Sequence, residues 1–184
     1  MPSSDPSPLR IVPGPPGWLH VDVFESEGDW GDTGRIESLL ASAAGALTGH
    51  PEIAAKEPCE ACIALSDDAA VRVLNATYRG MDKPTNVLSF PSPEPPSPDS
   101  PAFLGDVVIA LETVRREAGE KDVPFEHHLQ HLTVHGLLHL LGYDHETDDD
   151  AQVMERLETE ILAVLGIADP YEDRDVPAPA KGTG

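Results

Sequence analysis

The sequence predicts an α+β fold, in which helices cover a small four-stranded sheet. Three observations support this. Short strand-like apolar stretches lie mainly in the first 110 residues, and helical periodicity dominates the rest of the chain. Strands first and a run of helices afterwards are typical of an α+β layer fold. A long helical pattern rich in histidine ends at Gly142, and we expect a metal site at that end of the helix.

The first part of the chain predicts a strand, a helix and a second strand. Apolar and polar residues alternate over residues 19–23, as in a half-buried strand, and Ala61, Ile63 and Leu65 are expected on one face of a second strand. Between them, apolar residues recur at helical period from residue 36 to residue 47. Asp32 or Thr33 can cap this helix, because both side chains can accept hydrogen bonds from free backbone N–H groups.

Two further strands follow a second helix. We expect Ser66 to cap this helix and Gly80 to end it. Residues 86–90 predict a short strand, and the nearly continuous apolar run of residues 104–110 predicts a central one. The proline-rich stretch between them, residues 91–101, cannot lie inside a sheet, and we expect an exposed loop.

Helices account for most of the remaining chain. A short helix is expected over residues 112–119, and Pro124 suits the first turn of the long histidine-rich helix. Thr147 can cap the last helix. The apolar positions expected on its inner face are Met154, Leu157, Ile161 and Val164.

A length of 184 residues predicts one folded domain. Pro, Ser and Gly dominate residues 1–17, so we expect a disordered arm there. Residues 18–168 are expected to form a single metal-dependent hydrolase domain. Residues 169–184 again contain several prolines and predict a disordered tail.

The chain is strongly acidic, with a formal net charge of −21. Such a charge favours solubility and argues against a broad nucleic-acid-binding surface. The acidic residues are concentrated in places such as 148–150 and 172–175, so the total charge does not exclude a local cationic cleft.

The two cysteines, Cys59 and Cys62, have the spacing of half a zinc ribbon or a redox pair. Residues three apart in a strand point to opposite faces, which favours ordinary packing. No disulfide framework is implied, as in proteins of a reducing cytosol. We also find no signal-peptide pattern and no apolar run long enough to span a membrane, so we expect a cytoplasmic location.

The histidine-rich stretch predicts a metal site. His135 and His139 lie four residues apart, so their imidazoles share one face of a helix. Gly142 can take the left-handed conformation that ends the helix and turns the chain back toward it, which brings His145 to the pair. Three imidazoles with an open fourth position are typical of catalytic zinc. We therefore expect one Zn²⁺ per chain.

Spacing alone does not select this pair, because His127 and His131 continue the same four-residue series. Only His135 and His139 are near enough to the turn to meet His145. We expect His131 to support a ligand or to pack in the core. The zinc peptidase pattern has a glutamate base directly after its first histidine, and Gly136 stands there instead.

Three stretches together resemble the YbeY family, the bacterial zinc-dependent endoribonucleases of ribosomal RNA maturation. They are residues 131–145, residues 74–91 and residues 105–109, and the resemblance spans about residues 18–167. It implies a mixed sheet with helices packed against it. It also implies a single-strand endoribonuclease in rRNA processing, at the 3′ end of 16S rRNA, and in ribosome biogenesis or quality control. The implied partners are rRNA precursors and the ribosome or its small subunit, not DNA or membranes.

Arg79 is the expected phosphate-binding residue, because a guanidinium matches phosphate oxygens with two parallel hydrogen bonds. The resemblance places this arginine in the functional cleft, so we expect it to act in catalysis with the three histidines. Lys83 is a weaker candidate for substrate binding. Arg79 can instead bind Asp82 or the helix-end carbonyls, and Asp144 can orient a histidine or satisfy the turn backbone.

Two other functions stay open. One is a zinc hydrolase of a non-RNA substrate such as a peptide, against which Gly136 argues. The other is a non-catalytic ribosome-assembly factor whose zinc holds the fold. Structural zinc sites are usually closed by four protein ligands, and no fourth His or Cys is evident here.

Overall fold

The computed structural model describes residues 17–53 and 57–172 and has the expected α+β fold. The strands are β1 (Leu19–Glu25), β2 (Cys59–Ser66), β3 (Val87–Pro91) and β4 (Ala102–Ala110). The helices are α1 (Thr33–Thr48), α2 (Asp68–Arg79), α3 (Leu111–Glu120), α4 (Phe125–Leu140) and α5 (Asp148–Val164). Of the expected arm, residues 1–16 lie outside the described residues, as do residues 173–184 of the expected tail.

The four strands form one mixed sheet in the order β1-β2-β4-β3. The pairs β1–β2 and β2–β4 are parallel, whereas β3 runs antiparallel to β4. The prediction that residues 104–110 form a central strand is confirmed, because β4 pairs on both sides. The short strand β3 is left at one edge of the sheet, where it borders a cleft.

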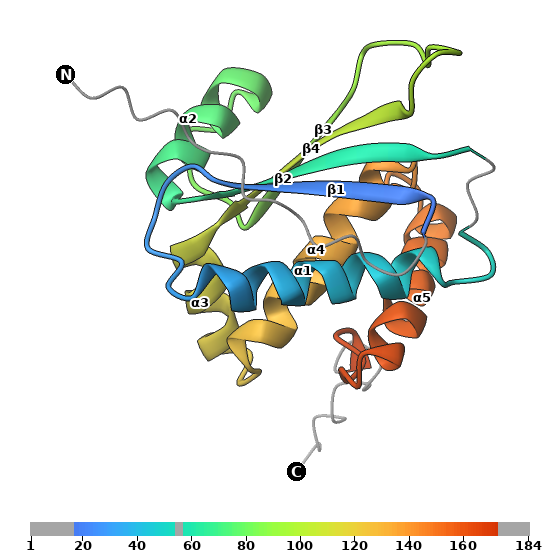
Figure 1. Ribbon diagram of the computed structural model, residues 1–184. Coiled ribbons are helices and arrows are strands. Elements are labelled where there is room, and N and C mark those ends of the chain that lie inside the picture. Colours follow the sequence, from blue (N-terminus) through green and yellow to red (C-terminus); the bar gives the residue numbers. More distant parts are fainter. Residues whose placement is uncertain (1–16, 54–56, 173–184) are drawn as a thin grey trace.

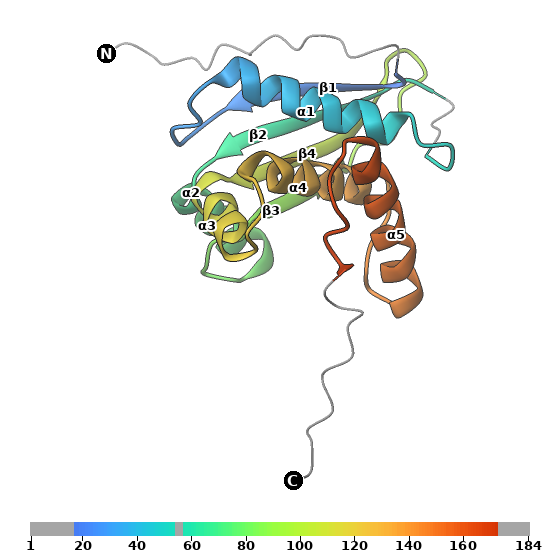
Figure 2. The ribbon, with the colours of Figure 1, turned by 90° about the horizontal axis from the view of Figure 1, so that it is seen from below.

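Helices cover the two faces of the sheet unequally, as Figure 1 shows. Helices α1, α3, α4 and α5 lie on one face, and seen from that side α1 and α4 run across the sheet with α5 beside them (Figure 2). Their apolar side chains and the inner side chains of the strands form the main core. Helix α2 covers part of the other face through a smaller cluster that includes Val71 and Val108. The long helix α4 lies in the middle of this layer, where it contacts β3 and β4 and also α1, α3 and α5.

Two local expectations are wrong. Helix α2 is capped by Asp67, whose carboxylate accepts from the Ala70 N–H at 2.8 Å, while Ser66 is the last residue of β2. On α5, Val164 does not face inward, since 74% of it is exposed. Leu162 faces the core instead of Val164, and Glu158 is also fully buried on this inner face.

Helix α4 approaches the sheet closely at Gly136. A Cβ atom at this position would lie 2.7 Å from Val107 Cγ1 on β4 and 3.4 Å from Ser89 Oγ on β3. The Ser89 hydroxyl also donates to the Gly136 carbonyl at 3.1 Å. Position 136 therefore has no room for a side chain, which explains why the glutamate of a zinc peptidase does not fit there.

Within residues 17–53 and 57–172, no helix has the length and apolarity that crossing a lipid bilayer requires.

The close approach at Gly136 predicts that Gly136→Ala destabilises the fold. Alanine favours a helix over glycine by about 1 kcal/mol, but overpacking a core costs about 1–3 kcal/mol. The neighbour here is the stiff, fully buried Val107, which cannot move away easily. We expect a net loss of about 1–2 kcal/mol in urea unfolding.

Gly45→Ala is the matched control, because Gly45 lies inside α1 with no atom within 4 Å of the added Cβ. This variant should be as stable as the wild type or gain up to about 1 kcal/mol. A Gly136→Ala variant that is stabilised to the same degree would show that the contact with Val107 is not tight.

Candidate metal centre

The end of α4 is built to reverse the chain. Gly142 has a φ of +96°, in the left-handed region that favours glycine. The Tyr143 N–H donates to the Leu138 carbonyl at 3.1 Å, and the Gly142 N–H donates to the His139 carbonyl at 3.0 Å. These two bonds form a Schellman motif, which satisfies the free carbonyls at the helix end. The turn then returns His145 to the last turn of α4.

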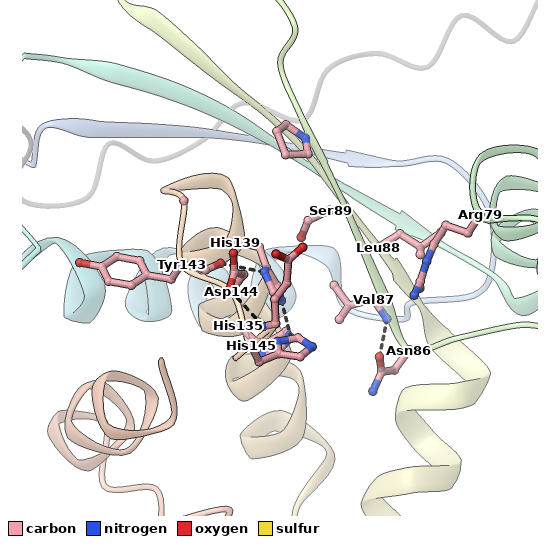
Figure 3. A pocket seen from close by; sticks show the side chains of 13 residues that line it. Arg79, Asn86, Val87, Leu88, Ser89, His135, His139, Tyr143, Asp144 and His145 are labelled. Atoms are coloured by element: carbon pink, nitrogen blue, oxygen red, sulfur yellow. Dashed lines mark hydrogen bonds between the residues drawn. The ribbon is translucent and has the colours of Figure 1, made fainter. Parts of the chain in front are cut away.

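The structure brings His135, His139 and His145 together, as Figure 3 shows. One ring nitrogen from each lies within 4.8 Å of the others. The ring centroids of His135 and His139 are 4.6 Å apart, and that of His145 is 5.1 Å from His139. In the described part of the chain, no other group of three potential ligands is gathered in this way.

The two helical histidines present the same nitrogen to the cluster. His139 Nδ1 lies 2.9 Å from the Tyr143 carbonyl, which can only accept, so Nδ1 carries the hydrogen. His135 Nδ1 donates in the same way to the Glu158 carboxylate. The two Nε2 atoms therefore have free lone pairs, and they lie 3.0 Å apart.

This donor set fits a zinc ion. Tetrahedral zinc with Zn–N distances of about 2.0–2.1 Å separates its nitrogen ligands by about 3.3–3.4 Å, close to the spacing of these Nε2 atoms. Two lone pairs at 3.0 Å repel each other unless a cation or a proton lies between them. Burial lowers the pKa of His139, and the neighbouring His135 and His145 lower it further, so the neutral form that binds metal is favoured.

Glu158 was not found by sequence reasoning. Burial alone would raise the pKa of its carboxyl group, but hydrogen bonds from His131 and His135 lower it to about 2, so the group is ionised. The sequence signal was available, because Glu158 lies in the helical stripe of buried residues that includes Met154 and Leu162. A carboxylate within such a stripe requires a buried partner.

The remaining histidines of α4 do not join the cluster. His131 is buried, with Nε2 at 3.6 Å from the Glu158 carboxylate. His128 is also buried and pairs with Glu117 at 2.7 Å. His127 is partly exposed. Of the four histidines at four-residue spacing, His135 and His139 thus belong to the cluster, whereas His127 and His131 do not.

A cleft of about 580 Å³ opens beside the three histidines. It follows β3 and is also lined by the turn of residues 142–146 and by Arg79 at the end of α2. In Figure 3, Arg79 lies across the cleft from the histidines, beyond Val87. Lys83 does not line this cleft. Substrate lying along β3 can therefore reach Arg79 and the histidines together.

Arg79 is exposed and directed to the cleft rather than to the neighbour suggested by the sequence. Asp82 is bound by Arg72, through two hydrogen bonds of 2.7 and 3.1 Å. Among the side chains in the described ranges, none forms an ion pair with Arg79. Its guanidinium thus keeps its capacity to bind an anion.

The cleft is not strongly cationic by itself. Its lining contains one arginine, Arg79, and two acidic residues, Asp144 and Glu146. The Asp144 carboxylate accepts from the Glu146 N–H at 3.1 Å and so stabilises the turn. A divalent cation at the histidines would reverse the sign of the local charge, which an anionic substrate requires.

Cys59 and Cys62 lie on β2, away from this site. Both are free thiols; Cys59 is buried and Cys62 is half-buried. Burial raises the pKa of Cys62 to about 11, with further increases from Asp106, Asp22 and Glu60. The thiol is therefore protonated at neutral pH and a poor metal ligand.

Fold and site together define a class: a small α+β domain with three histidines converging at the mouth of a cleft. Sequence comparison identifies the family: a family model described as Endoribonuclease YbeY matches residues 32–166. The chain belongs to the YbeY family.

Individual relatives have high identity. The Endoribonuclease YbeY of Bradyrhizobium sp. (strain BTAi1) is 61% identical over 120 residues, which cover 63% of this chain and 71% of that protein. That of Rhodopseudomonas palustris (strain BisB5) is 58% identical over 148 residues, covering 77% and 72%. A solution structure of a Thermotoga maritima protein aligns over 88% of this chain and 99% of that one, with 22% identity and a TM-score of 0.47.

The convergence of three imidazoles predicts that each is needed to hold a metal ion. Replacing His135, His139 or His145 by alanine should sharply reduce the zinc content of the purified protein, measured by plasma mass spectrometry. His20→Ala is the control, because His20 is an exposed residue of β1 and should leave zinc content unchanged. Stoichiometric zinc in all three cluster variants would exclude this site.

Zinc retention should also depend on pH. Protons compete for the ligating nitrogens, so retention should fall between roughly pH 7 and 5. Because the pKa of His139 is lowered from 6.5 in the folded state, the metal-free fold binds fewer protons than the unfolded chain. Its melting temperature should therefore fall as the pH drops below 6.5. Zinc affinity that stays constant across this window would show that the ligands are not histidines.

Proposed function

We propose that this protein is a zinc-dependent endoribonuclease that cleaves single-stranded RNA, with a role in ribosomal RNA processing. The observation that supports it most is the convergence of three histidine nitrogens at the mouth of a cleft that also contains Arg79, which has no ion-pair partner among the described residues. The relatives that carry the name Endoribonuclease YbeY support the choice of RNA as substrate.

The proposed ligands are His135, His139 and His145, which would hold the ion at the mouth of the cleft. When bound there, zinc supplies Lewis-acid chemistry, activating water near neutral pH and polarising a phosphoryl oxygen. The chain contributes the fixed orientation of two imidazoles, through Glu158 and the Tyr143 carbonyl. This orientation is set before substrate arrives, so it requires no rearrangement during the reaction.

Arg79 is proposed to bind the non-bridging oxygens of the scissile phosphate. Negative charge increases on these oxygens as the phosphodiester is attacked, and a bidentate guanidinium stabilises it. Arg79 is available for this because Asp82 is already bound by Arg72. Lys83 remains a weaker candidate for substrate binding. Because it does not line the cleft, it would contact substrate beyond the cleft.

Two alternatives have less support. A peptidase needs a general base beside the metal, and the position after His135 is Gly136, where the sheet leaves no room for glutamate. A purely structural zinc would need a fourth protein ligand, and the described residues gather only three.

The biological setting is proposed from the family. We propose that residues 18–168 act as one metal-dependent hydrolase domain on rRNA precursors, including the 3′ end of 16S rRNA, in ribosome biogenesis or quality control. The ribosome or its small subunit would be the partner, and the location would be the cytoplasm, where that substrate is found.

The proposal predicts that the zinc-loaded protein cleaves single-stranded RNA and leaves a generic peptide intact. His139→Ala should lose RNA cleavage together with zinc, because the Nε2 that it removes belongs to the site. Gel analysis of RNA and mass spectrometry of the peptide measure both reactions. Cleavage of the peptide alone, or full RNA cleavage by metal-free protein, would contradict the proposal.

Arg79 should affect turnover more than folding. Arg79→Ala is expected to reduce RNA cleavage about 10²–10³-fold, by analogy with the loss of one oxyanion donor. Arg79→Lys should restore only part of this, because an ammonium keeps the charge but not the bidentate geometry.

Arg35→Ala is the matched control for Arg79→Ala. It removes the same charge from an exposed position of α1, where the ion pair with Glu126 contributes little to stability. Its cleavage rate should match the wild type. If both variants lose activity equally, the effect belongs to the net charge of the protein, and Arg79 has no specific role.

A further inference from the structure

The middle of α5 contains a buried carboxylate directly behind the metal-binding histidines. The Glu158 side chain is fully buried. It accepts hydrogen bonds from His135 Nδ1 and from the Tyr171 hydroxyl, and His131 Nε2 lies 3.6 Å away. Burying an ionised carboxylate is costly unless donors compensate it, and here three side chains surround it.

The contact with Glu158 determines which nitrogen of His135 faces the cluster. One Glu158 oxygen accepts from the Tyr171 hydroxyl and the other lies against His135 Nδ1, so both oxygens act as acceptors and the ring hydrogen is on Nδ1. The lone pair is then on Nε2, which lies 3.0 Å from His139 Nε2. If the hydrogen moved to Nε2, it would occupy the place of the metal.

Stability alone does not account for a carboxylate at this position. Neighbouring positions on the same face of α5 are apolar, and Leu157, Ile161 and Leu162 are buried there. Replacing a buried ion pair by well-packed apolar residues is often neutral or stabilising. The specific effect of the glutamate is on the ring of His135.

A short segment after α5 supports this carboxylate. Thr159 donates from its hydroxyl to Asp169 at 3.1 Å, and the same Asp169 oxygen accepts from the Tyr171 N–H at 2.8 Å. The turn so formed directs the Tyr171 ring against His131, with centroids 5.8 Å apart, and its hydroxyl to Glu158. Residues 169–172 were expected to belong to a disordered tail. Instead, this segment is held against α5, and its Tyr171 contacts Glu158.

We propose that Glu158 is a positioning residue that fixes His135 as the Nδ1–H tautomer with Nε2 toward the metal, and that Tyr171 holds the Glu158 carboxylate in place. This inference rests on the proposed metal site. It adds that metal affinity depends on Glu158 of α5 and on Tyr171 of the segment after α5. Carboxylates behind a metal-bound histidine typically change metal affinity by about 10–100-fold when they are lost.

The test compares the full-length wild type with Glu158→Gln and Tyr171→Phe. A glutamine can accept from Nδ1 through its oxygen or donate to it through its nitrogen, so it no longer selects one tautomer. We expect zinc affinity, measured by chelator competition, to fall about 10–100-fold in Glu158→Gln. Nitrogen NMR of the metal-free protein should show a single Nδ1–H form of His135 in the wild type and a mixture in the variant.

Glu160→Gln is the matched control. Glu160 lies two residues further on the same helix and also contacts a histidine, His50, at 2.8 Å, but its other ion-pair partner is Arg156 rather than the cluster. Its zinc affinity and its His135 tautomer should match the wild type. Equal losses in Glu158→Gln and Glu160→Gln would overturn the proposal, because they would assign the effect to the negative charge of α5.

Wild-type zinc affinity and an unchanged tautomer in Glu158→Gln would also overturn it. If this variant does not fold, Tyr171→Phe decides, since it removes only a hydroxyl: a several-fold loss of zinc affinity supports the proposal and no loss contradicts it. The tautomer is measured without zinc or RNA. A failure of RNA cleavage in the wild type therefore rejects the proposed function without affecting this result.

Discussion

The contact between α4 and the sheet at Gly136 is the constraint on which the site depends. Because no side chain separates the helix from Val107 and Ser89, α4 lies directly on β4 and β3. His135, the preceding residue, is thereby placed beside the edge strand, and the cleft along β3 opens at the histidines. The same contact excludes the glutamate that peptidases use, so one packing requirement both forms the site and limits its chemistry.

Each ligand is held by a different kind of backbone or side-chain contact. The Schellman turn at Gly142 brings back His145 and also presents the Tyr143 carbonyl that orients His139. Helix α5 provides Glu158 for His135. The metal centre therefore joins α4, the turn and α5, and binding an ion there should stabilise their arrangement, because only the folded state has the site.

Much of the fold and part of the site could be predicted from the sequence, since they depend on local patterns. The four-residue spacing of His135 and His139 and the glycine at 142 sufficed for the cluster. Contacts that depend on how side chains pack in three dimensions could not be predicted. The pairing of Arg72 with Asp82 leaves Arg79 directed to the cleft, and only the packing of α5 on α4 places Glu158 behind His135. A net charge of −21 also could not indicate that the cleft contains only two acidic residues and one arginine.

The central claim is that one metal ion is held by the Nε2 atoms of His135 and His139 together with His145. Anomalous diffraction from crystals of the zinc-loaded protein, collected on both sides of the zinc absorption edge, tests it directly. We expect one strong peak about 2.0–2.1 Å from these three histidines, with its fourth position open to the cleft. A peak bound through His135 Nδ1, a fourth protein ligand that closes the site, or a peak only elsewhere in the molecule would contradict the claim.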